Sequence, residues 1–384
     1  MPSDRVAPQI FRNWRFDTYL VQKFGKRAES ARKSRKEPDV MEQRRFGNSG
    51  LSVSVLSFGT MTIGGRDRFG KMGTLGVSET LRILDICREA GVTTIDTADA
   101  YSSGGAEEIL GEALAGRRHD VVLVTKAFVR LGTGPHDVGL SRKHLIDACE
   151  ASLRRLRTDY LDLYICHQPD RFVAVDETLR AFDDLVSQGK VRYVGCSNHA
   201  AWQVMKALAV SERSGLTRYI CQQVLYSLIS RDVEHEIIPL GIDQSLGLMA
   251  WSPLHAGLLT GKFRRGVRPP VSRLNELDTP GTIDFERVYR IVDVLTEIAQ
   301  AREVTPAQVA LNWVLSKPGV DTVILGARDE VQLRDNLAAA TWRLTPDEVA
   351  RLDDVSSLPE PYPIWHQHKF GIERNPPLPG VRGS

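Results

Sequence analysis

The chain has 384 residues, of which 42% are hydrophobic and 26% charged, a composition that excludes the disordered and fibrous classes of protein. Its 50 Lys and Arg residues nearly balance its 48 Asp and Glu residues, leaving a formal net charge of +2. This balance gives no reason to expect a nucleic acid or an acidic membrane as partner. We therefore expect the partner to be a small molecule.

The cysteines are few and follow no metal-binding pattern. There are five, an odd number, at positions 87, 149, 166, 196 and 221, with no C-x-x-C pair and no Cys/His cluster at zinc spacing. The sequence therefore predicts neither a disulfide framework nor a metal site. It also has no signal-peptide pattern, and no apolar run approaches the roughly 20 residues that span a bilayer. We expect a cytoplasmic protein with no membrane contact.

The first 40 residues differ from the rest of the chain. They hold ten Lys and Arg residues against five Asp and Glu residues and show no strand-like alternation. We predict that residues 1–40 form a poorly packed extension and that residues 41–384 form a single domain. Met41 stands just before the organised pattern, so a start of translation there is a further hypothesis.

From Phe46 onward, short β-type runs alternate with amphipathic helices. The predicted strands are residues 53–58, 93–95, 121–124, 161–166, 191–194, 219–224, 248–250 and 322–325. The predicted helices are residues 78–89, 107–114, 141–155, 176–187, a helix from near Ala200, 285–302, 306–316 and 330–339. The proline-rich tail at 359–384 is expected to be irregular.

Eight strands interleaved with helices predict a parallel sheet, and this number of strands favours closure into a (β/α)8 barrel, the TIM barrel. The competing fold is an open, doubly wound sheet, which usually carries G-x-G-x-x-G after its first strand. The nearest glycine cluster here, Gly132-Thr133-Gly134, follows the third strand and has the wrong spacing. The sequence therefore favours the barrel.

Four ionisable side chains follow three consecutive strands, at the barrel end where such folds place their chemistry. Asp96 ends the second strand and Tyr101 lies five residues later, Lys126 ends the third strand, and His167 ends the fourth. Each alone is explained as a rim charge, a structural histidine or a helix cap. Together, on one rim, they predict a catalytic site.

The chemistry of this set is proton transfer. A free Tyr has a pKa near 10, and a neighbouring cation lowers it. Tyr101 beside Lys126 could then protonate an alkoxide, with Asp96 holding the Lys and His167 donating a hydrogen bond to the substrate oxygen. With no metal ligands nearby, an organic cofactor is expected to carry the hydride.

The same residues resemble the aldo-keto reductase family over about residues 44–336. Residues 96–101, Asp-Thr-Ala-Asp-Ala-Tyr, resemble the family's D-T-A-x-x-Y; Thr125-Lys126 resembles its T-K, and residues 167–170, His-Gln-Pro-Asp, its H-x-P-D. Residues 189–198 are similar to G-K-(I/V)-R-x-x-G-x-S-N, 222–227 to N-Q-x-x-Y-S, 251–262 to aromatic-S-P-L-x-x-G-L-L-T-G-K, and 326–336 to G-(A/S)-R-x-x-x-Q-x-x-x-N. Gln222 replaces the usual Asn, and Trp251 the commoner Tyr.

This resemblance implies NADPH or NADP⁺ as cofactor and assigns residues to it. Ser197, Asn198 and Gln223 would hold the nicotinamide carboxamide, Trp251 would stack on the ring, and Arg328 suits the adenosine 2'-phosphate. The full implied cofactor set is Gly59, Thr60, Asp96, Ser197, Asn198, Gln223, Trp251, Ser252, Pro253, Leu254, Gly257, Leu259, Lys262, Gly326, Arg328, Gln332 and Asn336. The implied activity is reduction of aldehydes or ketones to alcohols.

Several alternatives stay open at this point. Some members of the family serve as cofactor-sensing subunits of potassium channels, and an intact catalytic set does not distinguish them. A lyase using Lys126 as a Schiff-base nucleophile is disfavoured because Asp96 keeps the lysine charged. A metal-dependent hydrolase lacks its ligand pattern. The loop at 64–76 and the tail match no substrate-specific subgroup, so the substrate, like the oligomeric state, stays undefined.

Overall fold

The computed structural model describes residues 41–67, 73–267, 269, 274 and 283–371. The predicted extension at 1–40, part of the loop at 64–76 and the end of the tail lie outside the described residues. The described residues from Met41 onward belong to one compact unit.

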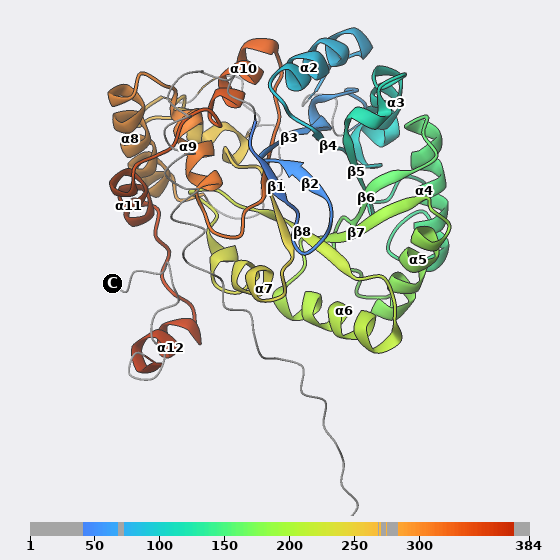
Figure 1. The fold of residues 1–384 in the computed structure, drawn as a ribbon. Coiled ribbons are helices and arrows are strands. Elements are labelled where there is room, and N and C mark those ends of the chain that lie inside the picture. The colour runs from blue at the N-terminus through green and yellow to red at the C-terminus, as the bar shows by residue number, and fades with distance from the viewer. Residues whose placement is uncertain (1–40, 68–72, 268, 270–273, 275–282, 372–384) are drawn as a thin grey trace, which may run out of the picture. The chain divides into compact units, whose positions relative to one another are not determined.

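Eight parallel strands close into a barrel in the order β10-β3-β4-β5-β6-β7-β8-β9 (Figure 1), so the predicted fold class is confirmed. The barrel strands are β3 (Leu56–Gly59), β4 (Thr94–Asp96), β5 (Val122–Ala127), β6 (Leu161–Cys166), β7 (Val191–Ser197), β8 (Tyr219–Leu225), β9 (Gly247–Trp251) and β10 (Thr322–Leu325).

Helices follow the strands around the outside of the barrel (Figure 1). They are α2 (Val77–Glu89), α3 (Gly105–Ala113), α4 (Arg142–Arg155), α5 (Val175–Ser187), α6 (Ala201–Ser214), α7 (Ile237–Asp243), α8 (Phe285–Ala301), α9 (Pro306–Leu315), α10 (Glu330–Ala338), α11 (Pro346–Val355) and α12 (Ile364–Gly371). Helix α9 begins as its sequence predicts, with Thr305 accepting a hydrogen bond from the backbone N–H of Gln308 and Pro306 in the first turn.

The first predicted strand, 53–58, is wrong as a single element. The chain forms β1 (Gln43–Arg45) and β2 (Ser52–Ser54), an antiparallel hairpin, before it enters the barrel as β3. Phe46 lies between β1 and β2, is fully buried, and packs with residues of the barrel interior. All six residues from 53 to 58 are buried, and a single residue separates β2 from β3, so the sequence in this stretch resembles one strand.

The C-terminal region also contains more helix than predicted. Helix α11 lies beyond the last predicted helix, and α12 forms within the tail expected to be irregular. Helix α12 has no buried residue, so its sequence lacks the apolar stripe by which a surface helix is recognised.

Alternation along the strands separates two apolar regions. Residues such as Val124, Ile165, Cys221 and Met249 point into the barrel and form one buried cluster. Their strand neighbours point outward, where Leu123, among others, joins the large core between strands and helices. The interior cluster fills the barrel beneath the candidate site.

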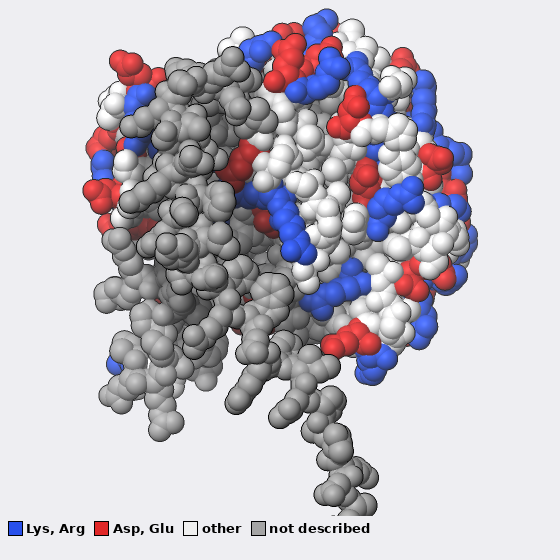
Figure 2. Space-filling view, in the orientation of Figure 1, with Lys and Arg blue, Asp and Glu red and all other residues white. Residues whose placement is uncertain are grey.

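On the face shown in Figure 2, acidic and basic side chains are interspersed, consistent with the near-balanced net charge. No helix within the described ranges has the length and apolar character needed to cross a membrane.

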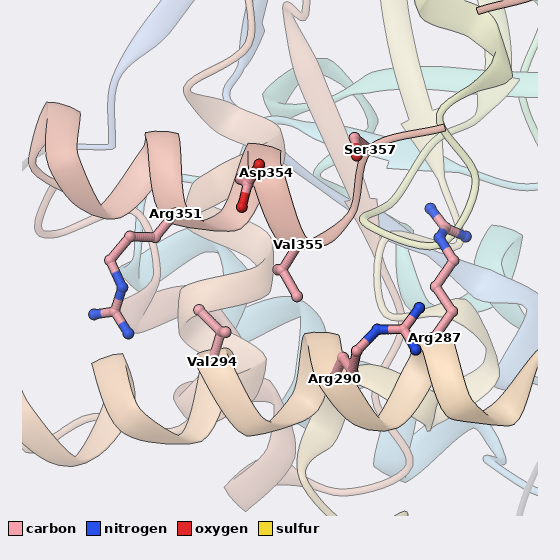
Figure 3. A pocket seen from close by; sticks show the side chains of 7 residues that line it. All are labelled: Arg287, Arg290, Val294, Arg351, Asp354, Val355 and Ser357. Carbon is pink, nitrogen blue, oxygen red and sulfur yellow. The ribbon is translucent and has the colours of Figure 1, made fainter. Parts of the chain in front are cut away.

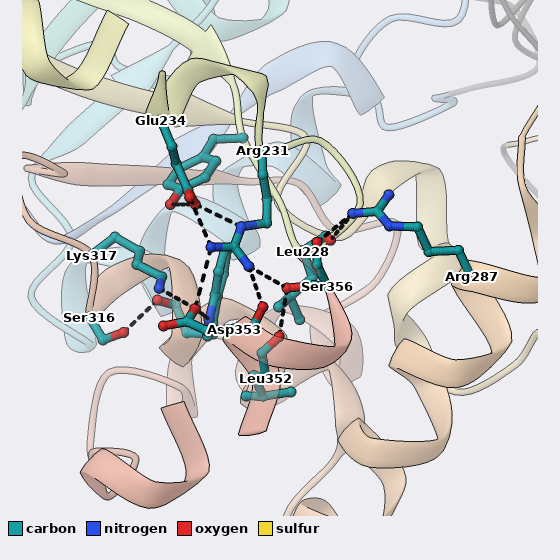
Figure 4. Close-up of polar contacts among 11 residues, drawn as sticks. Leu228, Arg231, Glu234, Arg287, Ser316, Lys317, Leu352, Asp353 and Ser356 are labelled. Atoms are coloured by element: carbon teal, nitrogen blue, oxygen red, sulfur yellow. Dashed lines mark hydrogen bonds and ion pairs between the residues drawn. The ribbon is translucent and has the colours of Figure 1, made fainter. Parts of the chain in front are cut away.

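Arg231 attaches helix α11 to the segment that follows β8 (Figure 4). Its guanidinium lies 2.8 Å from Oε2 of Glu234, and it donates to the backbone oxygen of Asp353 at 2.7 Å and to Oγ of Ser356 at 2.8 Å. It also lies over the ring of Trp313, 5.3 Å from the centroid. Only 12% of the Arg231 side chain is exposed, so this charge is held by protein groups rather than by water.

We predict that Arg231→Met lowers the free energy of unfolding by about 2 kcal/mol, because Glu234 loses its guanidinium partner and Asp353 keeps only Lys317. Urea unfolding would measure the change. The control is Arg88→Met, which removes an arginine whose side chain is 64% exposed and should stay near wild type. Equal effects of the two substitutions would contradict the prediction.

Candidate active site

Several predicted polar residues lie next to the apolar cluster inside the barrel, because they occupy the next inward-facing positions on the same strands. Lys126 lies two positions beyond Val124 on β5, and Gln223 two beyond Cys221 on β8. In the same way Trp251 follows Met249 on β9. Inward-facing positions thus change from apolar to polar at the C-terminal ends of the strands, where barrel folds place their sites.

Lys126 is the centre of the site. Its Nζ donates to Oδ2 of Asp96 at 2.8 Å, to the backbone oxygen of Thr97 at 2.7 Å and to the hydroxyl of Tyr101 at 3.4 Å. Lys126 is fully buried and Asp96 is 2% exposed. The ring of His167 lies 6.1 Å from that of Tyr101, centroid to centroid, in an edge-on arrangement. The structure therefore brings all four predicted catalytic residues together.

Lys126 carries its charge despite its burial. Burial alone lowers the pKa of Lys126, but the attraction of Asp96 and of Tyr101 and the hydrogen bonds to both outweigh it, and the pKa is raised. A lysine with a raised pKa is a poor amine nucleophile, which speaks against Schiff-base chemistry at this position.

The backbone after Tyr101 is strained. Ser102 and Ser103 have φ of 51° and 49°, in the left-handed region that non-glycine residues seldom adopt. Oγ of Ser102 donates to the backbone oxygen of Ile63 at 2.8 Å, which ties the turn to the segment after β3. This conformation fixes the start of the 3-10 segment Tyr101–Gly104 and with it the phenol.

A second buried polar group lies beside the predicted residues, and sequence reasoning missed it. Glu107 is fully buried, accepts from Oγ1 of Thr125 at 2.5 Å and from Nε of Arg155 at 2.7 Å. Asp99 is also fully buried, and neither of its carboxylate oxygens has a hydrogen-bond partner in the described part of the chain. The separation of 48 residues between Glu107 and Arg155 leaves no local signal in the sequence.

Ser197, Asn198 and Gln223 lie on adjoining strand ends. Oγ of Ser197 donates to the backbone oxygen of Gln223 at 2.9 Å, and Nδ2 of Asn198 donates to that of His167 at 2.9 Å. Nε2 of Gln223 donates to Oδ1 of Asp96 at 2.7 Å. The residues implied for the carboxamide are therefore joined by hydrogen bonds to Asp96 and His167, two of the four predicted catalytic residues.

The segment after β9 has an unusual backbone. Ser252, His255, Ala256 and Gly257 all have positive φ, and a 3-10 segment, His255–Thr260, follows the first turn. Successive residues in such conformations can turn N–H groups toward one point, as anion-binding loops do. Lys262 is exposed just beyond this segment, whereas the side chain of Leu259 is buried in the main core.

The segment after β10 is braced by its own side chains. Oδ1 of Asp329 accepts from the backbone N–H of Gln332 at 2.8 Å, and the Gln332 side chain accepts from that of Arg328 at 3.3 Å. Asn336 donates to the backbone oxygen of Gly326 at 3.4 Å. Gly326 and Arg328 are exposed at the start of α10, where a helix N-terminus favours anions.

Other groups of potential chemical interest are inert. All five cysteines are free and buried, and burial raises the pKa of Cys87 to about 12. Within the described ranges no group of three or more His, Cys, Asp and Glu residues could hold a metal ion.

Asp99 gives this site a testable pH dependence. Burial, followed by repulsion from Glu107, raises the pKa of Asp99 well above the usual carboxyl value. The stabilising contribution of its proton is therefore complete below about pH 4 and is lost as the pH rises through the raised folded-state pKa. We predict that Asp99→Asn, which stays neutral, becomes progressively more stable than wild type as the pH rises.

Urea unfolding between about pH 4 and pH 8 would measure this difference, whose slope is limited to about 1.4 kcal/mol per pH unit. Asp120→Asn, which removes an exposed carboxylate, serves as the control. Parallel stability curves for wild type and Asp99→Asn would show that Asp99 is ionised in the folded protein.

Comparison with known proteins identifies the family of the chain. The model of the Aldo/keto reductase family matches residues 55–357. A probable voltage-gated potassium channel subunit beta of Arabidopsis thaliana is 39% identical over 324 residues, which cover 82% of this chain and 96% of the relative. The corresponding protein of Oryza sativa subsp. japonica is 40% identical over the same shares. A versiconal hemiacetal acetate reductase of Aspergillus parasiticus is 34% identical, covering 82% of this chain and 96% of the relative. The chain belongs to the aldo/keto reductase family.

Proposed function

We propose that this protein reduces aldehydes or ketones to alcohols with NADPH, using Tyr101 as the proton donor. The observation that carries the proposal is the buried ammonium of Lys126, 2.8 Å from Asp96 and 3.4 Å from the Tyr101 hydroxyl. A fixed cation beside a phenol favours release of its proton, as the protonation of an alkoxide requires. Membership of the family supports the reaction class.

The residues at the rim fit a dinucleotide. Oγ1 of Thr60 and Nε1 of Trp251 are buried atoms without a hydrogen-bond partner among the described residues, so a bound polar group could complete them. The backbone at Gly257, with φ of 92°, has open space on the side where a Cβ would stand, as a close approach by a phosphate requires. When bound, NADPH would supply the hydride.

The residues of the candidate site would each have a defined role in this reaction. Ser197, Asn198 and Gln223 would orient the nicotinamide amide, and Arg328 would contact the 2'-phosphate. His167 would donate a hydrogen bond to the substrate oxygen as negative charge develops there. Tyr101 would pass its proton to that oxygen, and Lys126, held by Asp96, would stabilise the phenolate that remains.

We predict that Tyr101→Phe lowers kcat for aldehyde reduction by about 10²- to 10⁴-fold, because the proton donor is lost. Affinity for NADPH should change little, since the phenol hydroxyl has no part in holding the cofactor. Steady-state oxidation of NADPH with aromatic, aliphatic and sugar aldehydes, and a cofactor titration, would measure both. Tyr160→Phe, outside the site, is the control, and full kcat in Tyr101→Phe would exclude Tyr101 as the donor.

We predict that Arg328→Ala weakens binding of NADPH at least about tenfold while leaving NADH nearly unchanged, because only NADPH carries the 2'-phosphate. Fluorescence titration with each cofactor would measure the two dissociation constants. The control is Arg334→Ala, which removes an arginine from α10, the helix that begins two residues after Arg328. Equal losses for both cofactors in Arg328→Ala would contradict the assignment.

The second candidate function is that of a cofactor-binding subunit of a potassium channel. The observation in its favour is that three relatives, 35–40% identical and 94–96% covered, are described as probable or putative potassium channel beta subunits. The acid–base site does not separate the two functions. Tight NADPH binding without turnover across the aldehyde panel would favour the subunit, and turnover abolished by Tyr101→Phe would favour the enzyme.

A further inference from the structure

A pocket of about 510 Å³ lies between helices α8 and α11, lined by none of the residues of the candidate active site. Its lining combines three arginines, Arg287, Arg290 and Arg351, with Val294 and Val355 and with one carboxylate, Asp354. In Figure 3 the side chains of Arg287 and Arg290 lie on one side of the two valines and that of Arg351 on the other. The volume is within the range of roughly 300–1,000 Å³ found for small-molecule sites.

The positive charge of this pocket is incompletely balanced. Arg351 pairs with Glu297 at 2.5 Å. Neither Arg287 nor Arg290 forms an ion pair with any described residue, and Arg290 is exposed. Burial, followed by repulsion from Arg231, lowers the pKa of Arg287. The attraction of Asp284 and Asp232 opposes this shift without reversing it, and the repulsion from Arg290 is the smallest of these effects.

Arg287 is held in place rather than free to turn into solvent. Its guanidinium donates to the backbone oxygens of Leu228 at 3.4 Å and Ser356 at 2.6 Å (Figure 4). It also donates to the backbone oxygen of Ile229 at 2.9 Å. Carbonyl oxygens fix the position of this cation without cancelling its full charge. The edge of the pocket therefore carries a preorganised positive charge, with the long, exposed side chain of Arg290 beside it.

We propose that this pocket binds a small organic phosphate, with Arg290 as its main direct contact. Guanidinium groups match the geometry and charge of a phosphate dianion, which offers several acceptor oxygens to their N–H donors. The two valines between the arginines give the carbon part of such a ligand an apolar surface. The Asp354 carboxylate would accept a hydrogen bond from a hydroxyl on that carbon part, and its charge would repel a second anionic group of the ligand.

The test is isothermal titration of the full chain with glycerol 3-phosphate at constant ionic strength. We expect saturable binding that Arg290→Gln weakens at least about tenfold. The matched control is Arg213→Gln, which removes an exposed arginine of α6 that has no ion pair among the described residues and should leave binding unchanged. Absence of saturable binding, or equal losses in the two variants, would overturn the proposal.

Two further titrations identify the site that the phosphate occupies and the chemical class that the pocket prefers. The first titration uses Arg328→Ala, which alters the candidate cofactor site. If Arg328→Ala loses binding of glycerol 3-phosphate and Arg290→Gln keeps it, the ligand occupies the cofactor site instead. Succinate tests the chemical class, because a dicarboxylate should bind more weakly than the phosphate ester. Tighter binding of succinate would overturn the assignment to phosphate.

Discussion

The structure of the candidate site depends on one interaction, the ion pair of Lys126 with Asp96 inside the barrel. A lone ammonium at a fully buried position would lose its proton or destabilise the fold. The Asp96 carboxylate, the Thr97 carbonyl and the Tyr101 hydroxyl together surround Nζ with acceptors. The charge survives burial for this reason, and the Tyr101 phenol is placed within its reach.

The surrounding polar groups are organised around this pair. Gln223 donates to the second carboxylate oxygen of Asp96, and Ser197 and Asn198 connect Gln223 to His167 through backbone oxygens. Beside them lies a second polar layer in which Glu107 is satisfied by Thr125 and Arg155. Burial and the neighbouring Glu107 raise the pKa of the Asp99 carboxyl well above its usual value.

The relatives of this chain are described with two different functions. Proteins described as channel beta subunits and a protein described as a reductase both align over more than nine-tenths of their own length. A fold does not determine which of the two is performed, since function depends on the site and its partners. The arrangement of Asp96, Lys126 and Tyr101 is compatible with both functions, so measurements of turnover and of cofactor binding have to separate them.

The sequence by itself determined the barrel and the rim on which its polar residues stand. Short β-type runs that end in Asp96, Lys126 and His167 alternate with amphipathic helices, and parallel strands bring their C-terminal ends to one rim. The Arg155–Glu107 pair, the burial of Asp99 beside it and the Arg287–Arg290 pocket were decided only by the tertiary structure. Their members are distant in sequence or meet groups from different helices, so no local periodicity marks them. The hairpin that precedes β3 and the helix α12 were likewise decided only by the tertiary structure. Strand β1 is short and largely exposed, a single residue separates β2 from β3, and α12 has no buried face by which a surface helix is recognised.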